Sequence, residues 1–103
     1  MIKHVVMWKL KDFAEGCDRK ENANKIKALL EGLKDKIEQI VHLEVGVNLN
    51  DSNMAFDAVL ISEFQDIHGL EIYKNHPEHL KVADFVAKVR LDRAVVDYLM
   101  QGN

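Results

Sequence analysis

Cysteine and proline each occur once in this 103-residue chain, and aromatic side chains make up only 7% of it. A lone cysteine, Cys17, cannot form a disulfide within the chain, which fits a reducing compartment and predicts a cytoplasmic location. The acidic neighbours Glu15 and Asp18 disfavour a thiolate, so Cys17 is a poor candidate for a nucleophile. The shortage of cysteine therefore excludes a disulfide-stabilised scaffold and a cysteine-based metal site.

Long hydrophobic runs and an excess of positive charge are also missing. The apolar stretch 54–62 is interrupted by Asp57 and is much shorter than a membrane span. Residues 1–10 have a short apolar core between lysines and lack the small-residue cleavage pattern of a signal peptide. The net charge is −3 and the basic residues are dispersed along the chain. We therefore expect neither a membrane nor a nucleic acid as a partner.

What remains is the composition of an ordinary soluble protein, with 48% hydrophobic and 30% charged residues. A chain of this length is large enough to bury one hydrophobic core. It contains no repeat, linker or low-complexity tract. The sequence therefore predicts a single domain over residues 1–103.

Hydrophobic periodicity predicts the order of secondary structure. Alternating or continuous apolar residues indicate four strands, at 2–10, 41–49, 55–64 and 90–100. A loop is expected over 11–17, followed by a helix that begins at the capping box Asp18-x-x-Glu21. That helix carries an apolar stripe formed by Ile26, Leu29, Leu30, Leu33 and Ile37. A short helix after Asp66 and another after Pro77 complete a β-α-β-β-α-β order, which is that of a ferredoxin-like α+β domain with an antiparallel four-stranded sheet.

The predicted sheet is apolar on both faces, although one layer of helices covers only one of them. The side chains expected on the uncovered face are Val5, Met7, Val59, Ile61, Val96 and Tyr98. A bare apolar patch of this size is unusual on a monomer, so we expect two copies to pack sheet to sheet as a two-fold homodimer. The alternative is a lipid or ligand on that face.

The segment Tyr73-Lys74-Asn75-His76-Pro77-Glu78-His79 concentrates titratable side chains around the only proline. Proline pushes the preceding residue out of the helical region and is well tolerated at the first position of a new helix, so the segment predicts a corner between two helices. Three interpretations remain open. The histidines fix the corner, or Tyr73 and His79 are the polar groups of a small-molecule pocket, or His76 and His79 bind a metal ion.

The chain also resembles a known family. The opening residues 2–11, the Leu43-Glu44-Val45-Gly46 segment, the Tyr73-x-x-His76-Pro77-x-His79 corner and the closing Val96-Asp97-Tyr98 together resemble the stress-responsive A/B-barrel (Dabb) domain family. This resemblance spans nearly the whole chain. It implies a dimeric α/β barrel, in agreement with the prediction from the two apolar faces.

The resemblance implies site residues as well. Plant polyketide cyclases of this family use the tyrosine and the second histidine of the corner, which match Tyr73 and His79, and the family's aspartate on the last strand matches Asp97. Asp97 is expected to hydrogen-bond His79, orient its imidazole and raise its pKa, or else to serve only as a structural salt bridge. The remaining candidates are ligand-binding residues, namely His4, Val6, Trp8 and His76.

Two functions follow as hypotheses. The first is a homodimeric binding protein with no catalysis and a pocket for a small apolar ligand between sheet and helices. The second is an enzyme without cofactor or metal, either cyclase-like or monooxygenase-like, acting on a small apolar or aromatic carbonyl compound. In the second, His79 is the general base and Tyr73 is the hydrogen-bond donor to the carbonyl oxygen.

Overall fold

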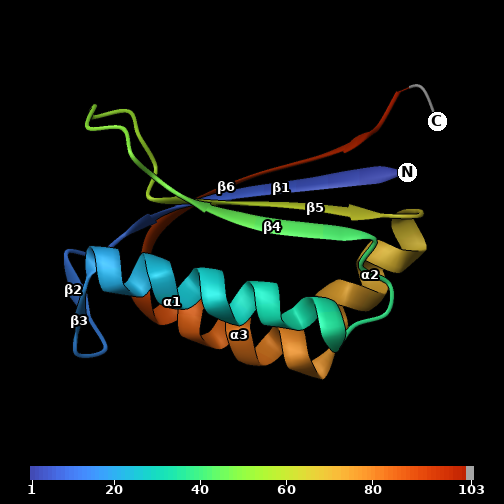
Figure 1. Ribbon diagram of the computed structural model, residues 1–103, viewed down its shortest axis with the longest axis horizontal. Helices are drawn as coiled ribbons and strands as arrows, with labels where there is room; N and C mark the ends of the chain where they lie inside the picture. Colours follow the sequence, from blue (N-terminus) through green and yellow to red (C-terminus); the bar gives the residue numbers. More distant parts are fainter. Residues whose placement is uncertain (102–103) are drawn as a thin grey trace.

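The computed structural model describes residues 1–101, and it places all helices on one side of a four-stranded sheet (Figure 1). The strands of this sheet are β1 (Ile2–Leu10), β4 (His42–Val47), β5 (Ala58–Phe64) and β6 (Arg90–Leu99). The helices are α1 (Arg19–Glu31), the 3-10 turn η1 (Gly32–Asp35), α2 (Ile67–Asn75) and α3 (Pro77–Val89). A separate two-stranded hairpin is formed by β2 (Phe13–Ala14) and β3 (Cys17–Asp18).

The sheet has the order β4-β5-β1-β6, and every neighbouring pair is antiparallel. This confirms the predicted ferredoxin-like α+β fold. The strand β1 lies between β5 and β6, and its alternate residues Ile2, His4, Val6, Trp8 and Leu10 are all buried. The core therefore lies between the sheet and the helix layer, in which α1 and α3 run side by side beneath the sheet (Figure 1).

The capping box predicted for α1 is present. The Asp18 carboxylate accepts a hydrogen bond from the backbone N–H of Glu21, and the Glu21 side chain accepts one from the N–H of Asp18. The apolar stripe is buried with one exception, because Leu29 is exposed. The helix α1 also ends earlier than the apolar stripe predicts, at Glu31. Residues 32–35 form the 3-10 turn η1, and Ile37, which follows η1, is buried in the core.

A loop was predicted over residues 11–17, but the structure has most of the β2–β3 hairpin there. Ala14 pairs with Cys17, and the two residues between them, Glu15 and Gly16, both have positive φ angles, 51° and 78°. Two such residues in succession form the tight turn whose twist matches that of antiparallel strands. Glycine adopts this backbone conformation without strain, whereas Glu15 is the only non-glycine residue among residues 1–101 with a positive φ.

The proline corner forms as predicted. The helix α2 ends at Asn75, His76 has an extended backbone, and Pro77 is the first residue of α3. The Nδ1 atom of His76 accepts a hydrogen bond from the backbone N–H of Glu78, so this histidine caps the start of α3. Tyr73 and His79 are thereby held on the two sides of one short corner.

The face of the sheet that lies away from the helices is apolar and partly open to solvent. Val5 is paired with Ile61 and with Val96, and Met7 is paired with Val59. Met7, Val96 and Tyr98 expose 37%, 59% and 46% of their surface. The prediction that these side chains lie on the uncovered face is therefore confirmed.

Replacing Asp18 by alanine should lower the free energy of unfolding by about 1 kcal/mol, because the N–H of Glu21 loses its acceptor at the start of α1. Chemical denaturation monitored by circular dichroism measures this change. The variant Asp51→Ala is a matched control, since Asp51 is an exposed aspartate in the loop between β4 and β5. An equal loss in both variants would show that charge, rather than capping, is responsible.

Candidate functional site

A cavity of about 290 Å³ lies between the sheet and α3. Its apolar wall consists of Val6, Leu30, Leu60, Val82, Ala83, Val86 and Ala87. Its polar and aromatic groups are His4, Trp8, Tyr73, His79, Arg90 and Arg93. The volume is at the lower end of the range for small-molecule pockets, and the mixture of many apolar walls with a few polar groups is typical of them. Of the seven candidate residues named from the sequence, five line this cavity.

Tyr73 is the most deeply buried polar residue of the cavity, with none of its surface exposed. Its ring packs against Phe64, His4 and His79, with centroid separations of 5.0, 6.2 and 4.4 Å. Within residues 1–101 its hydroxyl finds no hydrogen-bond partner, although buried hydroxyls nearly always have one. Burial raises the pKa of the phenol, with a smaller opposing effect from Arg93, so the hydroxyl stays protonated and can donate a hydrogen bond.

His79 is held by the corner itself. Its Nδ1 atom lies 3.0 Å from the backbone carbonyl oxygen of Lys74, and because a carbonyl only accepts, we assign the proton to Nδ1. The Nε2 atom then carries the free lone pair. Burial lowers the pKa of His79, partly offset by the bond to Lys74, so the imidazole is neutral at pH 7. A neutral imidazole with a free Nε2 is able to accept a proton.

The expected hydrogen bond between Asp97 and His79 does not form. The carboxylate of Asp97 lies instead 2.5 Å from Nδ1 of His4 and 3.9 Å from Nζ of Lys74. The physical reason is strand register, because His4 on β1 is directly opposite Asp97 on β6. The Asp97 carboxylate therefore orients the imidazole of His4 rather than that of His79. Burial lowers the pKa of His4, and the bond to Asp97 opposes this effect.

The structure brings His4, Val6, Trp8, Tyr73 and His79 to the cavity, but His76 is not among the lining residues. Its Nδ1 atom is used by the helix cap described above. His76 therefore lies outside the cavity, where it serves as a helix cap. The sequence analysis did not name the two charged lining residues, Arg90 and Arg93, as site candidates. The signal for Arg93 was its register opposite Trp8, which alternation along a single strand does not reveal.

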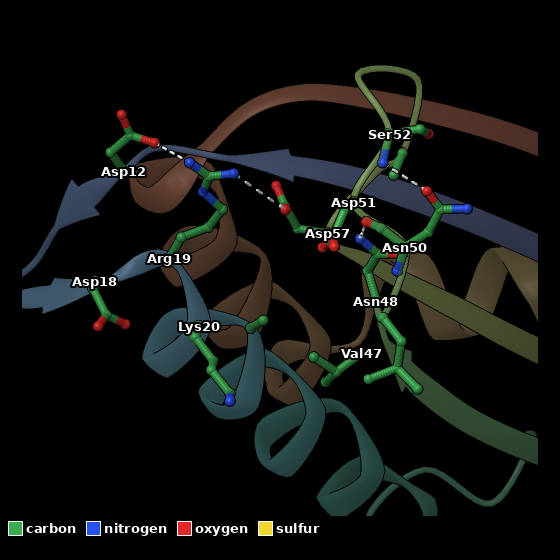
Figure 2. A pocket seen from close by; sticks show the side chains of 13 residues that line it. Asp12, Asp18, Arg19, Lys20, Val47, Asn48, Asn50, Asp51, Ser52 and Asp57 are labelled. Carbon is green, nitrogen blue, oxygen red and sulfur yellow. Dashed lines mark hydrogen bonds and ion pairs between the residues drawn. The ribbon is translucent and has the colours of Figure 1, made fainter.

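A larger hollow of about 790 Å³ lies between the start of α1 and the loop that joins β4 to β5 (Figure 2). Three of its charged side chains pair with one another. Arg19 forms ion pairs with Asp12 and Asp57, and Asp57 also accepts a hydrogen bond from the backbone N–H of Leu10. Because these groups already have partners, the smaller cavity with its unpartnered hydroxyl is the stronger candidate for a functional site.

Residues 1–101 contain no group of three or more histidine, cysteine, aspartate or glutamate side chains arranged to hold a metal ion. The same part of the chain has no helix long and apolar enough to cross a membrane.

The lowered pKa values of His4 and His79 predict how stability depends on pH. An unfolded histidine has a pKa of about 6.5, so below that pH the unfolded chain binds more protons than the folded one and stability falls. The melting temperature should therefore decrease between pH 7.5 and pH 5.5. The decrease should be smaller in His79→Gln and unchanged in His42→Gln, in which a half-buried histidine of β4 is replaced. A wild-type melting temperature that rises over this interval would contradict burial of neutral imidazoles.

Solved structures with similar folds are found in bacteria and plants. A dimeric protein of unknown function and ferredoxin-like fold from Bacteroides fragilis superimposes with a TM-score of 0.85 and 34% identity, covering 96% of this chain and 95% of that one. The hydroxynitrile lyase from Passiflora edulis superimposes with a TM-score of 0.80, covering 99% of this chain and 94% of that one. Since its identity is 16%, this second likeness shows the fold alone.

Sequence comparison agrees with the fold. The stress-response A/B barrel domain-containing protein DABB1 of Arabidopsis thaliana is 26% identical over 106 aligned positions, which cover 98% of this chain. The match covers 48% of the plant protein, so the chain spans about half the length of this relative. Residues 2–100 match the family described as the Stress responsive A/B Barrel Domain. Together with the β-α-β-β-α-β fold, this match shows that the chain belongs to the stress-responsive A/B barrel (Dabb) domain family.

Proposed function

We propose that this protein is a homodimer that binds a small apolar or aromatic carbonyl compound in the cavity between its sheet and α3. The observation that carries the proposal is the Tyr73 hydroxyl, which is buried at the cavity and has no hydrogen-bond partner within residues 1–101. Leaving a buried hydroxyl unpaired costs about 1–3 kcal/mol of stability. A ligand oxygen that accepts a hydrogen bond from Tyr73 removes this cost, and the apolar wall takes the rest of the ligand.

A second candidate function is acid–base catalysis without a cofactor at the same site. It is favoured by the arrangement of Tyr73 and His79, whose rings are 4.4 Å apart, with the Nε2 lone pair of His79 free. Tyr73 polarises a carbonyl by donating a hydrogen bond, and His79 removes a proton from the adjacent carbon. Asp97 acts on His4 in this scheme, so it is a positioning residue rather than a partner of the base. The Passiflora lyase shares this fold, so an enzyme is compatible with it.

The homodimer is supported by the apolar outer face of the sheet. Val96 and Tyr98 of β6 extend this surface to the sheet edge, and Met7 and Val59 occupy its middle. Apolar surface of this kind is stabilised by removal from water at roughly 25 cal/mol per Å². A second copy packed sheet to sheet buries the same residues on both chains, as a two-fold interface requires, and gives the dimeric α/β barrel. The Bacteroides fragilis relative is itself a dimeric protein.

Replacing both Met7 and Val59 by aspartate should convert the dimer to monomer, because four carboxylates would be buried in the symmetric interface. Light scattering coupled to size-exclusion chromatography gives the mass directly. The control is Leu80→Asp, which places a charge on an exposed apolar residue of α3, away from the outer face of the sheet. A double variant that remains a folded dimer would contradict the sheet-to-sheet interface.

Replacing Tyr73 by phenylalanine should weaken binding of acetophenone and benzamide by about fivefold, since the lost hydrogen bond contributes roughly 1 kcal/mol. The same variant should unfold no more easily than the wild type, because the hydroxyl has no hydrogen-bond partner to lose among residues 1–101. Isothermal titration calorimetry and denaturant unfolding measure the two effects.

The matched control is Tyr98→Phe, which removes a hydroxyl from the outer face of the sheet and should leave the affinity unchanged. If Tyr73→Phe instead destabilises the fold by 1 kcal/mol or more without changing ligand affinity, the hydroxyl is structural and the proposed function is wrong.

A further inference from the structure

Two guanidinium groups at the cavity, those of Arg90 and Arg93, have no side-chain partner among residues 1–101. Arg90 follows α3 as the first residue of β6, and Arg93 lies opposite Trp8 on the neighbouring strand β1. Trp8 faces the helices, so its partner Arg93 lies on the helix side of the sheet as well. Both arginines line the cavity, and within residues 1–101 neither side chain forms a hydrogen bond or an ion pair.

The two carboxylates of β6, Asp92 and Asp97, form no ion pair with these arginines. Asp97 is engaged by His4 and by the Lys74 ammonium group. Asp92, between the two arginines in sequence, accepts a hydrogen bond from the backbone N–H of Arg93. It pairs with Lys9 and therefore lies on the opposite face of β6 from Arg93. The cavity thus has two cationic groups and no lining carboxylate.

The remaining polar groups of the cavity do not offset this positive charge. Burial keeps the imidazoles of His4 and His79 neutral by lowering their pKa values, and the charge of Arg93 lowers both pKa values further. Tyr73 stays protonated because burial raises the pKa of its phenol. All three groups are therefore uncharged at neutral pH, and an anion in the cavity would meet only neutral and positively charged side chains.

We propose that the natural ligand of this cavity is a small apolar carboxylic acid, bound as its anion with the carboxylate at Arg90 and Arg93. This assignment rests on the proposed function, because it names the chemical class of ligand for the same cavity. The guanidinium group is planar and presents paired N–H donors that match the two oxygens of a carboxylate. The apolar body of the acid packs against Val82 and Val86 of α3. Where the acid has a further oxygen outside its carboxylate, that oxygen accepts a hydrogen bond from Tyr73.

The test compares acids with uncharged amides of the same shape, so that only the charge differs. Dissociation constants for benzoate against benzamide, and for hexanoate against hexanamide, are measured at pH 7.5 by titration calorimetry. In the wild-type protein we expect each acid to bind at least about tenfold more tightly than its amide, because charge-assisted hydrogen bonds are roughly twice as strong as neutral ones. The preference should fall sharply in Arg93→Gln, which leaves only Arg90, and fall less in Arg93→Lys, which keeps the charge.

The variant Lys88→Gln removes one positive charge from α3 at an exposed residue that does not line the cavity, and it should keep the full preference for acids. Equal binding of acids and amides in the wild type would overturn the carboxylate assignment and leave the proposed pocket intact. An equal loss of preference in Lys88→Gln and Arg93→Gln would also overturn it, since net charge rather than contact would be responsible. Failure of all four compounds to bind would overturn the proposed function itself.

Discussion

The helices of this chain cover one face of the sheet, although the strands are apolar on both faces. The positions of the core, of the cavity and of the exposed apolar surface all depend on this difference. On the covered face, the alternate residues of β1 from Ile2 to Leu10 are buried beneath the helix layer (Figure 1). The helix layer does not cover β6 completely: on the helix side of this strand, Val95 and Leu99 are exposed. The cavity lies where α3 and β1 adjoin this strand. On the other face no element within residues 1–101 replaces the missing helices, and this is the basis for proposing a second copy as its cover.

The proline corner decides which polar groups reach the cavity. An uninterrupted helix would place residues six apart on different sides, since successive residues turn by about 100°. The break at His76 and Pro77 changes the direction of the chain between Tyr73 and His79, and their rings pack 4.4 Å apart beside β1. The corner is stabilised by the His76 cap and by the bond from His79 to the carbonyl of Lys74. The same hydrogen bonds that end one helix and start the next therefore position the candidate site.

Local patterns were sufficient to predict most of the fold. Alternation along residues 2–10, the Asp18 capping box and the corner at Pro77 each depend on neighbours within a few residues, and all three are present. Pairings between distant strands were harder, because alternation identifies the two faces of a strand but not its register. Asp97 was therefore assigned to the wrong histidine, and Arg93 was missed although its partner Trp8 had been named. The dimer, the cytoplasmic location and the ligand remain predictions.

A crystal structure of the protein grown without added ligand is the most direct test of the central claim, that the space between α3 and the sheet is a functional cavity. We expect two copies packed through their outer sheet faces, with the cavity open and a water or small molecule within hydrogen-bond distance of the Tyr73 hydroxyl. A structure in which side chains from α3 fill this space and a protein atom accepts the hydrogen bond of Tyr73 would contradict the account.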